Sequence, residues 1–322
     1  MKPSMESPSK TKSFLLVGTV ILTVLTLCSF FVGKYPLTLS GLLSGDAIQW
    51  RGFLTLRASR AVIGAIGGFV LGVTGFVYQT VFRNPLASPD IIGASSGASV
   101  GAAFGILFLP GAVAVTLSAF AGAICCVLLA LTLSSLTAEK DGKSIVLSGI
   151  AVHSLAQTAL VCLKLLADPE KQLASIEYWI MGSLNGISLY SIGGNIALCL
   201  ICLVGMFLLY RQILLLSLDD QEGRLLGVNV TQIRLIVLLI ATLAASSVIS
   251  MTGLISFISL LAPHGARLLF KNNRLSTMLF SLTLGDIFAR SIASTELPVS
   301  IFTSLLGAPF LIYLCIRRKP LQ

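Results

Sequence analysis

The sequence predicts an all-α membrane protein with many transmembrane helices. Apolar residues make up 55% of the 322 residues and charged residues only 11%, with a mean hydropathy of +0.94. Soluble domains carry about 25% charged residues, so water cannot cover most of this surface. The apolar residues also form runs of about 20 between charges, the length that an α-helix needs to cross a bilayer.

Four spans are delimited by charged residues on both sides. They are Phe14–Gly33, Ala61–Phe82, Ser144–Leu163 and Leu297–Ile316. The run from Ile91 to Ala138 contains no charge over 48 residues, too many for one crossing, and Pro110-Gly111 predicts the turn that divides it into two helices.

The remaining spans are less regular. A helix is expected over Ile192–Tyr210, after an interfacial loop that contains Gly182 and Gly186. Leu235–Ala266 is overlong, and Gly253 and Pro263 predict a full span followed by a shorter broken helix. A weak segment, Leu275–Arg290, completes the set.

The charges of the two tails decide the number of spans. Lys2, Lys10 and Lys12 precede the first span and Arg317, Arg318 and Lys319 follow the last, so both tails are expected in the cytoplasm. An even count, ten, then places most of the 22 Lys and Arg residues inside. We expect tails at 1–13 and 317–322 around one transmembrane domain at 14–316. The first run is too long for a signal-peptide core.

Glycines recur at every fourth residue in two of the expected helices. The residues are Gly64, Gly68 and Gly72 in the second span, and Gly93, Gly97, Gly101 and Gly105 in the third. Such stripes let helices approach closely in lipid. Helix packing is the favoured interpretation; lining a substrate path is the alternative.

Two segments on the expected cytoplasmic side contain prolines and acidic residues that a simple connecting turn does not require. Between the second and third spans, residues 83–90 read R-N-P-L-A-S-P-D, where two prolines fix a turn and Asp90 begins the next helix. The segment 214–230 gathers Asp219, Asp220 and Glu222 on a short amphipathic stretch that ends near Gly227. Cytoplasmic segments of membrane proteins are usually enriched in Lys and Arg, so a cluster of acidic residues there is unusual. One interpretation is a contact surface for a basic partner, and the other is a solvated loop.

The other chemistry-bearing residues predict no enzyme. Asp286 and Arg290 stand four residues apart in the ninth span as a structural pair or a transport element. The two histidines, His153 and His264, lack a third ligand nearby, so no metal site is expected. Gly142-Lys143-Ser144 lacks the first glycine of a phosphate-binding loop, and the seven cysteines lie in apolar runs without zinc spacing. The net charge of +9 is scattered, which argues against nucleic-acid binding.

Eight segments in register resemble the FecCD-type permeases, the membrane subunits of ABC importers for iron-siderophores, haem and cobalamin, including the vitamin B12 importer. The similarity covers nearly the whole chain. The matching segments are 56–60, 84–98, 179–184, 214–230, 253–267, 286–290, 296–298 and 306–310. The sequence departs from the family pattern at Ser59, where proline is common, at Ser259 and Ser300, where glycine is common, and at Gly223, where alanine is common.

The resemblance implies the type II ABC importer permease fold: ten helices per subunit in a bacterial cell membrane, with two permease subunits around a central path. It also implies two cytoplasmic ATPases that use ATP, an external substrate-binding protein, and no cofactor bound by this chain. Arg57, Arg60 and Arg290 match the docking site for the binding protein, and Asn84 and Leu86 match the cytoplasmic gate. The segment that seats on the ATPase matches Asp219, Asp220, Glu222, Gly223, Leu226 and Gly227. The fifth and tenth helices are expected to line the path.

On this basis the expected function is import of a metal chelate, with an iron-siderophore as the first choice of cargo. This chain is not expected to catalyse a reaction. The partner is an identical or a related permease, and the alternative cargoes are haem and cobalamin. The alternative is a secondary transporter driven by an ion gradient. Such proteins usually carry buried acids at mid-membrane, often beside broken helices, and here only Asp286 is close to that description.

Overall fold

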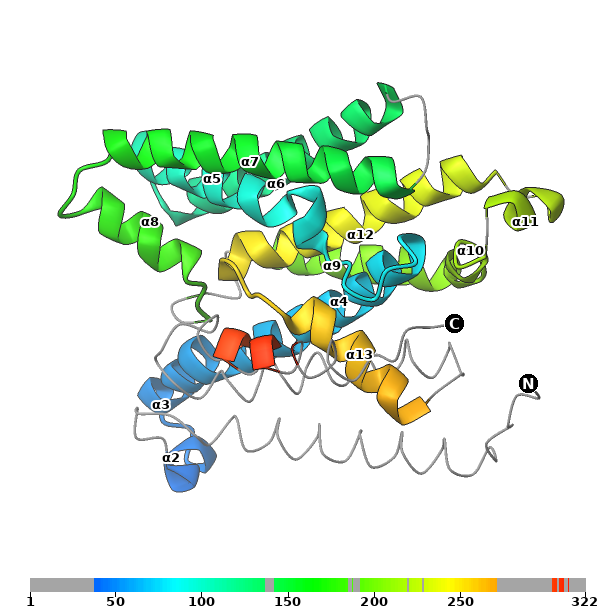
Figure 1. The fold of residues 1–322 in the computed structure, drawn as a ribbon. Coiled ribbons are helices and arrows are strands. Elements are labelled where there is room, and N and C mark those ends of the chain that lie inside the picture. The colour runs from blue at the N-terminus through cyan, green and yellow to red at the C-terminus, as the bar shows by residue number, and fades with distance from the viewer. Residues whose placement is uncertain are drawn as a thin grey trace.

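The computed structural model describes residues 38–136, 142–184, 187, 192–218, 220–227, 229–270, 303–305, 307–309 and 312 of the chain. All regular secondary structure in these residues is helical (Figure 1). The helices run roughly along one direction, so the bundle has two ends. One end carries α2, α3 and α8, and the other carries α10 and α11; we call them the α8 end and the α11 end.

The elements follow each other in a simple order. They are α2 (Leu39–Leu43), α3 (Ala47–Gly52), the π-helical turn η1 (Phe53–Ala58), α4 (Ser59–Val81), the 3-10 turn η2 (Pro89–Ile92), α5 (Ala94–Phe108), α6 (Ala112–Leu136), α7 (Gly142–Leu166), α8 (Gln172–Ile180), α9 (Gly193–Leu208), α10 (Tyr210–Leu215), α11 (Asp220–Leu225), α12 (Val230–Thr252) and α13 (Ile258–Phe270).

Four stretches in the described residues are long and apolar enough to cross a membrane: Ala47–Val81, Ala112–Leu136, Ser144–Leu166 and Val230–Thr252. In the most apolar part of each stretch, 78% of the residues are buried in Ala47–Val81 and 72% in Val230–Thr252. The corresponding values are 17% for α6 and 33% for α7. Helices α4 and α12 therefore form the centre of the bundle, and α6 and α7 lie at its surface, as Figure 1 shows.

The uncharged run from Ile91 to Ala138 forms two helices, as predicted. The turn between α5 and α6 lies at Leu109–Gly111, and Gly111 has φ +87°, a left-handed conformation that suits glycine. The two helices pack closely against each other. A Cβ atom on Gly101 would lie 2.0 Å from the carbonyl oxygen of Ser118, and one on Gly97 would lie 2.4 Å from that of Gly122. Only residues without a side chain allow this separation.

One predicted glycine has a different role from the rest of the stripe, and one close approach lies at a glycine outside it. Gly93 lies before α5 with φ +88°, so its backbone turn explains the glycine better than helix packing does. In α4, Gly64, Gly68 and Gly72 are buried as expected. The closest approach in α4, however, is at Gly75, where a Cβ atom would lie 1.7 Å from the carbonyl oxygen of Ser259 in α13. The fourfold spacing did not include Gly75.

The broken helix predicted after the seventh span breaks at one of its two candidate residues. Helix α12 ends at Thr252, Gly253 follows with φ +72°, and α13 begins at Ile258. Pro263 lies inside α13 and does not interrupt it. A proline cannot donate to the carbonyl four residues earlier, here that of Ser259, and this carbonyl faces Gly75 of α4. The neighbouring helix thus covers the backbone group that the proline leaves without a donor.

Three further features were not expected from the sequence. Helix α8 lies in a segment for which no helix was predicted. Helix α12 begins at Val230, where the Asn229 side chain accepts a hydrogen bond from the Gln232 amide at 3.2 Å, so Arg234 lies inside the helix. Helix α4 continues back through η1 into α3, which places Arg57 and Arg60 in a continuous helix and not at its start.

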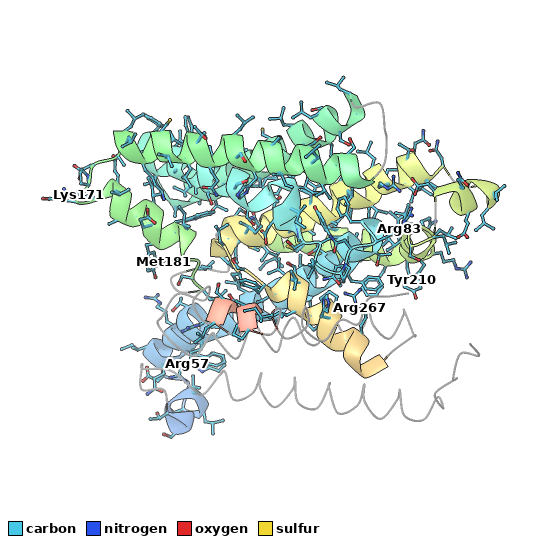
Figure 2. The ribbon with its side chains drawn as sticks, viewed as in Figure 1. Arg57, Arg83, Lys171, Met181, Tyr210 and Arg267 are labelled. Atoms are coloured by element: carbon cyan, nitrogen blue, oxygen red, sulfur yellow. The ribbon has the colours of Figure 1, made fainter. Side chains whose placement is uncertain are left out.

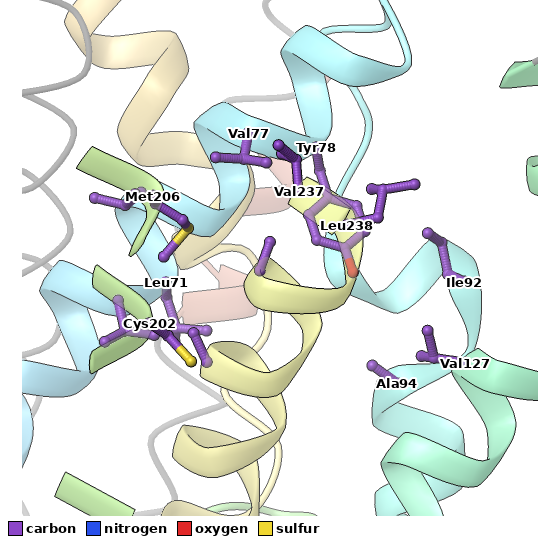
Figure 3. Packing of buried hydrophobic residues seen from close by; sticks show 14 of the residues in the cluster. Leu71, Val77, Tyr78, Ile92, Ala94, Val127, Cys202, Met206, Val237 and Leu238 are labelled. Atoms are coloured by element: carbon purple, nitrogen blue, oxygen red, sulfur yellow. The ribbon is translucent and has the colours of Figure 1, made fainter. Parts of the chain in front are cut away.

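A mostly aliphatic core joins α4, α9 and α12. Leu71 and Val77 of α4, Met206 of α9 and Leu238 of α12 all belong to it (Figure 3). Buried polar groups pair across the same helices. The hydroxyls of Tyr78 and Thr242 share a hydrogen bond of 2.6 Å, and the Asn195 amide donates to the Ser250 hydroxyl at 3.0 Å. These bonds satisfy polar atoms that lipid or apolar packing would otherwise leave without partners.

The predicted number of ten spans is not decided by these helices. The first and ninth spans and most of the tenth lie outside the described residues, as do the tails 1–13 and 317–322. The count of ten and the boundaries of the 14–316 domain therefore stay predictions.

Candidate functional site at the two ends of the bundle

The residues singled out in the sequence gather at opposite ends of the bundle. Arg57 lies near the α8 end, and Arg83, which precedes the expected gate residues, lies near the α11 end (Figure 2). Asp220, Glu222 and Gly223 belong to α11 itself. Arg290, Asp219 and Ser300 lie outside the described residues.

The loop after α4 is a compact turn with an exposed tip. The Asn84 side chain accepts a hydrogen bond from the Leu86 amide at 3.0 Å, and its carbonyl oxygen accepts one from the Ala87 amide at 3.0 Å. Asn84 and Leu86 are exposed, whereas Ala87 and Ser88 are buried. The loop is therefore held at its base and presents its two expected gate residues outward.

The turn continues into η2 and α5 through Asp90. Its carboxylate accepts hydrogen bonds from the hydroxyl of Ser95, the second residue of α5, and from that of Ser88 at 3.4 Å. An acid at this position also favours the helix N-terminus electrostatically. Asp90 therefore fixes the path of the chain from the loop into α5.

One carboxylate at the α11 end binds two arginines from distant parts of the chain. Asp220 Oδ1 pairs with the guanidinium of Arg83, and Arg234 Nη2 donates to Asp220 Oδ1 at 2.7 Å and to Oδ2 at 3.0 Å. We call these three residues the Asp220 cluster. Only 4% of the Arg234 side chain is exposed, against 30% of the Asp220 side chain, so loss of Asp220 would leave a buried arginine without its carboxylate.

The Asp220 cluster changes the interpretation of the acidic segment. The sequence left two interpretations of this segment open, a surface for a basic partner and a solvated loop, and the structure shows the Asp220 carboxylate engaged within the chain. Arg83 stands 137 residues from Asp220, and no local pattern connects them. Only the packing of the 82–88 loop beside α11 and α12 brings them together.

The rest of α11 is more exposed and fits a contact surface. Leu225 is 87% exposed, Leu226 is 61% exposed, and Glu222 is exposed as well. Gly223 faces the other way: a Cβ atom there would lie 2.7 Å from Val230 Cγ2 of α12. Glycine at this departure from the family pattern lets α11 lie close to α12. Gly227 follows with φ +76° and ends the segment, as predicted.

The two expected docking arginines that are described differ in exposure. Arg57 lies in η1 and is only 7% exposed, whereas Arg60 in α4 is half-buried. The amide of Ser59 donates to the Leu54 carbonyl, and its hydroxyl donates to the same oxygen at 2.8 Å. Proline, common here in the family, lacks that amide hydrogen. Ser59 therefore stabilises the π-helical turn that carries Arg57.

A cavity of about 660 Å³ lies near the α8 end, between α5, α6, α8 and the end of α12. Its lining is mostly apolar and contains no charged residue; the hydroxyl groups come from Thr116, Ser175, Tyr178, Ser183, Ser250 and Thr252. Its volume lies within the range of small-molecule sites. Among the residues that the structure describes, no three His, Cys, Asp or Glu side chains are grouped so as to hold a metal ion.

Curated proteins similar to this chain are permeases with several cargoes. It is 35% identical to the "Probable iron chelatin transport system permease protein" of Helicobacter pylori over 280 residues, which is 83% of this chain and 82% of the relative. It is 32% identical to the hemin transport system permease protein HmuU of Yersinia pestis, covering 97% of both chains. The cobalamin import system permease protein BtuC of Halobacterium salinarum is 32% identical, with 81% and 72% covered.

The fold and the family agree with these relatives. A solved structure described as an inward-facing conformation of an ABC transporter of the metal-chelate type matches 96% of this chain and 100% of its own, with a TM-score of 0.83 at 25% identity. The pattern of the FecCD transport family matches residues 21–317. The helical bundle and the motifs at its two ends thus occur together over most of the chain, which belongs to the FecCD transport family.

Proposed function

We propose that the chain is the membrane-spanning permease subunit of an ABC importer, and that its cargo is a metal chelate, an iron-siderophore first. The proposal rests chiefly on the relatives, several of which are named for iron chelatin, hemin or, in Dickeya dadantii, achromobactin transport. The chain itself makes and breaks no bonds and binds no cofactor. Partner ATPases hydrolyse ATP, and an external binding protein delivers the cargo.

The α11 end would receive the ATPase. Exposed Leu225 and Leu226 beside Glu222 form a small apolar and acidic surface that fits a partner's groove. The Asn84–Leu86 tip lies beside α11 and would close the inner end of the path. Both chain termini are then cytoplasmic, as the positive tails suggest.

The α8 end would receive the binding protein. Arg60 is the more accessible arginine of the described docking pair, and Arg57 is buried in η1, three residues earlier. Acidic residues on the binding protein would pair with these arginines and with Arg290. Charged contacts at the edge of an interface chiefly increase the association rate and orient the two proteins.

A second permease subunit, identical or related, would complete the path. Helix α7, the expected fifth span, exposes large apolar side chains. These are Leu147, Ile150, Leu155, Val161 and Leu165. Lipid or a second subunit has to cover such a face, and we propose that the second subunit covers part of it and that α7 borders the path.

The test is transport by the complex reconstituted in liposomes with its ATPase and binding protein. Uptake of an iron-siderophore should require ATP and should be insensitive to an uncoupler. A matched sample with the permease alone should give no uptake above background. Uptake by the permease alone, driven by a proton or sodium gradient, would replace this proposal with the secondary transporter.

A further inference from the structure

The last turn of α4 and the start of the loop after it bind three other elements. The Tyr78 hydroxyl bonds with Thr242 of α12 at 2.6 Å. The Gln79 side chain donates to the Leu260 carbonyl of α13 at 3.2 Å and accepts from the Arg267 guanidinium. The third contact is the ion pair of Arg83 with Asp220 of α11. A displacement of α11 is therefore directly connected to the end of α4.

The ion pair between Asp220 and Arg234 is strong. Arg234 is almost completely buried, and its Nη2 binds both oxygens of the Asp220 carboxylate. Charge-assisted bonds of this kind are strong, and a buried arginine that loses its carboxylate is left unpaired in a poorly solvated place. Helix α11 is thereby held to α12, and Gly223 lets the two lie close together.

Arg83 links Asp220 to the loop after α4. It is a non-glycine residue with φ +49°, a conformation that persists only where the surroundings hold it. Asn84 and Leu86 follow directly. The Arg83 side chain binds Asp220, and its backbone begins the loop. A movement of α11 therefore displaces the first residue of the loop that carries Asn84 and Leu86.

We propose that Asp220 is a positioning residue that couples α11 to the loop after α4. Through Arg83 and Arg234, it makes α11, α12 and the loop move together when the ATPase displaces α11. This inference rests on the proposed function, in which α11 seats on an ATPase. Asp220 does not touch the ATPase in this scheme, which distinguishes it from Glu222 and Leu226.

The test measures cargo moved per ATP hydrolysed by the full complex in liposomes. In Asp220→Asn, ATP hydrolysis should stay within about twofold of the wild type while the amount of cargo moved per ATP falls at least tenfold. Asp220→Glu, which keeps the charge, should restore at least half of the ratio.

A second variant covers the case in which Asp220→Asn fails to assemble. Arg83→Gln removes only the link to the loop and keeps the buried pair of Asp220 with Arg234, so the complex should assemble and show the same tenfold loss. A ratio within twofold of the wild type in Arg83→Gln would overturn the proposal, and so would a parallel loss of hydrolysis and transport. If the wild type itself transports without the ATPase, the proposed function fails instead.

Discussion

Individual glycines set the distances between the helices of this bundle. Gly101 brings α5 so close to α6 that a Cβ atom would lie 2.0 Å from a backbone oxygen, which cannot rotate away as a side chain can. Gly75 does the same between α4 and α13, where it faces the carbonyl that Pro263 leaves without a donor. In lipid, where burial of apolar surface contributes little to helix association, such close packing is a main source of stability.

Gly101→Ala should therefore destabilise the protein. One added methyl group has to push α5 and α6 apart, and overpacking of this kind costs about 1–3 kcal/mol. The midpoint of thermal unfolding in detergent should fall by several degrees. The matched control is Gly193→Ala at the start of α9, where a Cβ atom would meet nothing within 4 Å. An equal fall in both variants would contradict the packing role of Gly101.

Short helix α11 has two faces with separate tasks. Asp220 and Gly223 attach it to α12 and to the loop after α4, whereas Leu225 and Leu226 point away from the chain. A helix of this length is not stable by itself, so the attached face holds it in place. The outward face is then free to bind a partner.

Leu226→Glu should weaken binding of the ATPase and leave the permease folded. A charge placed in an apolar contact loses its hydration without gaining a partner, and we expect affinity to fall at least tenfold, about 1.4 kcal/mol. Co-purification or a binding titration in detergent measures this. Leu43→Glu, at an 81% exposed leucine near the α8 end, is the matched control and should bind normally. Equal weakening in both would place the contact elsewhere.

At the scale of the whole molecule, the bundle has two ends with different chemistry. The α8 end holds Arg57, Arg60 and an uncharged cavity, and the α11 end holds the Asp220 cluster and exposed leucines. The two ends are separated by the length of α4 and α12. In the proposed function, the α11 end faces the cytoplasm and the α8 end faces the outside of the cell.

Labelling from the two sides of the membrane tests this orientation. In a background without the seven native cysteines, Glu170→Cys near α8 should react with an impermeant maleimide from outside the cell. Gln221→Cys on α11 should react only after the membrane is opened, since both residues are exposed but at opposite ends. Reaction of both from the same side would refute the predicted topology.

The long apolar helices could be predicted because each one depends on its own residues. A backbone in lipid has to satisfy its hydrogen bonds within the segment, so an apolar run of 20 residues between charges becomes a helix. The turn at Pro110-Gly111 and the break at Gly253 follow from local conformational preferences. Helix α8 was missed because it is short and lies between charges, where periodicity is weak.

Contacts between distant segments could not be predicted in the same way. The sequence by itself determined the membrane class, the family and the candidate residues at each end. Only the tertiary structure decided that Asp220 faces inward to Arg83 and Arg234, that Arg57 is buried, and that Pro263 is tolerated inside a helix. A side chain's partner depends on which helices pack together and in what rotation, and that arrangement results from all the close approaches at once.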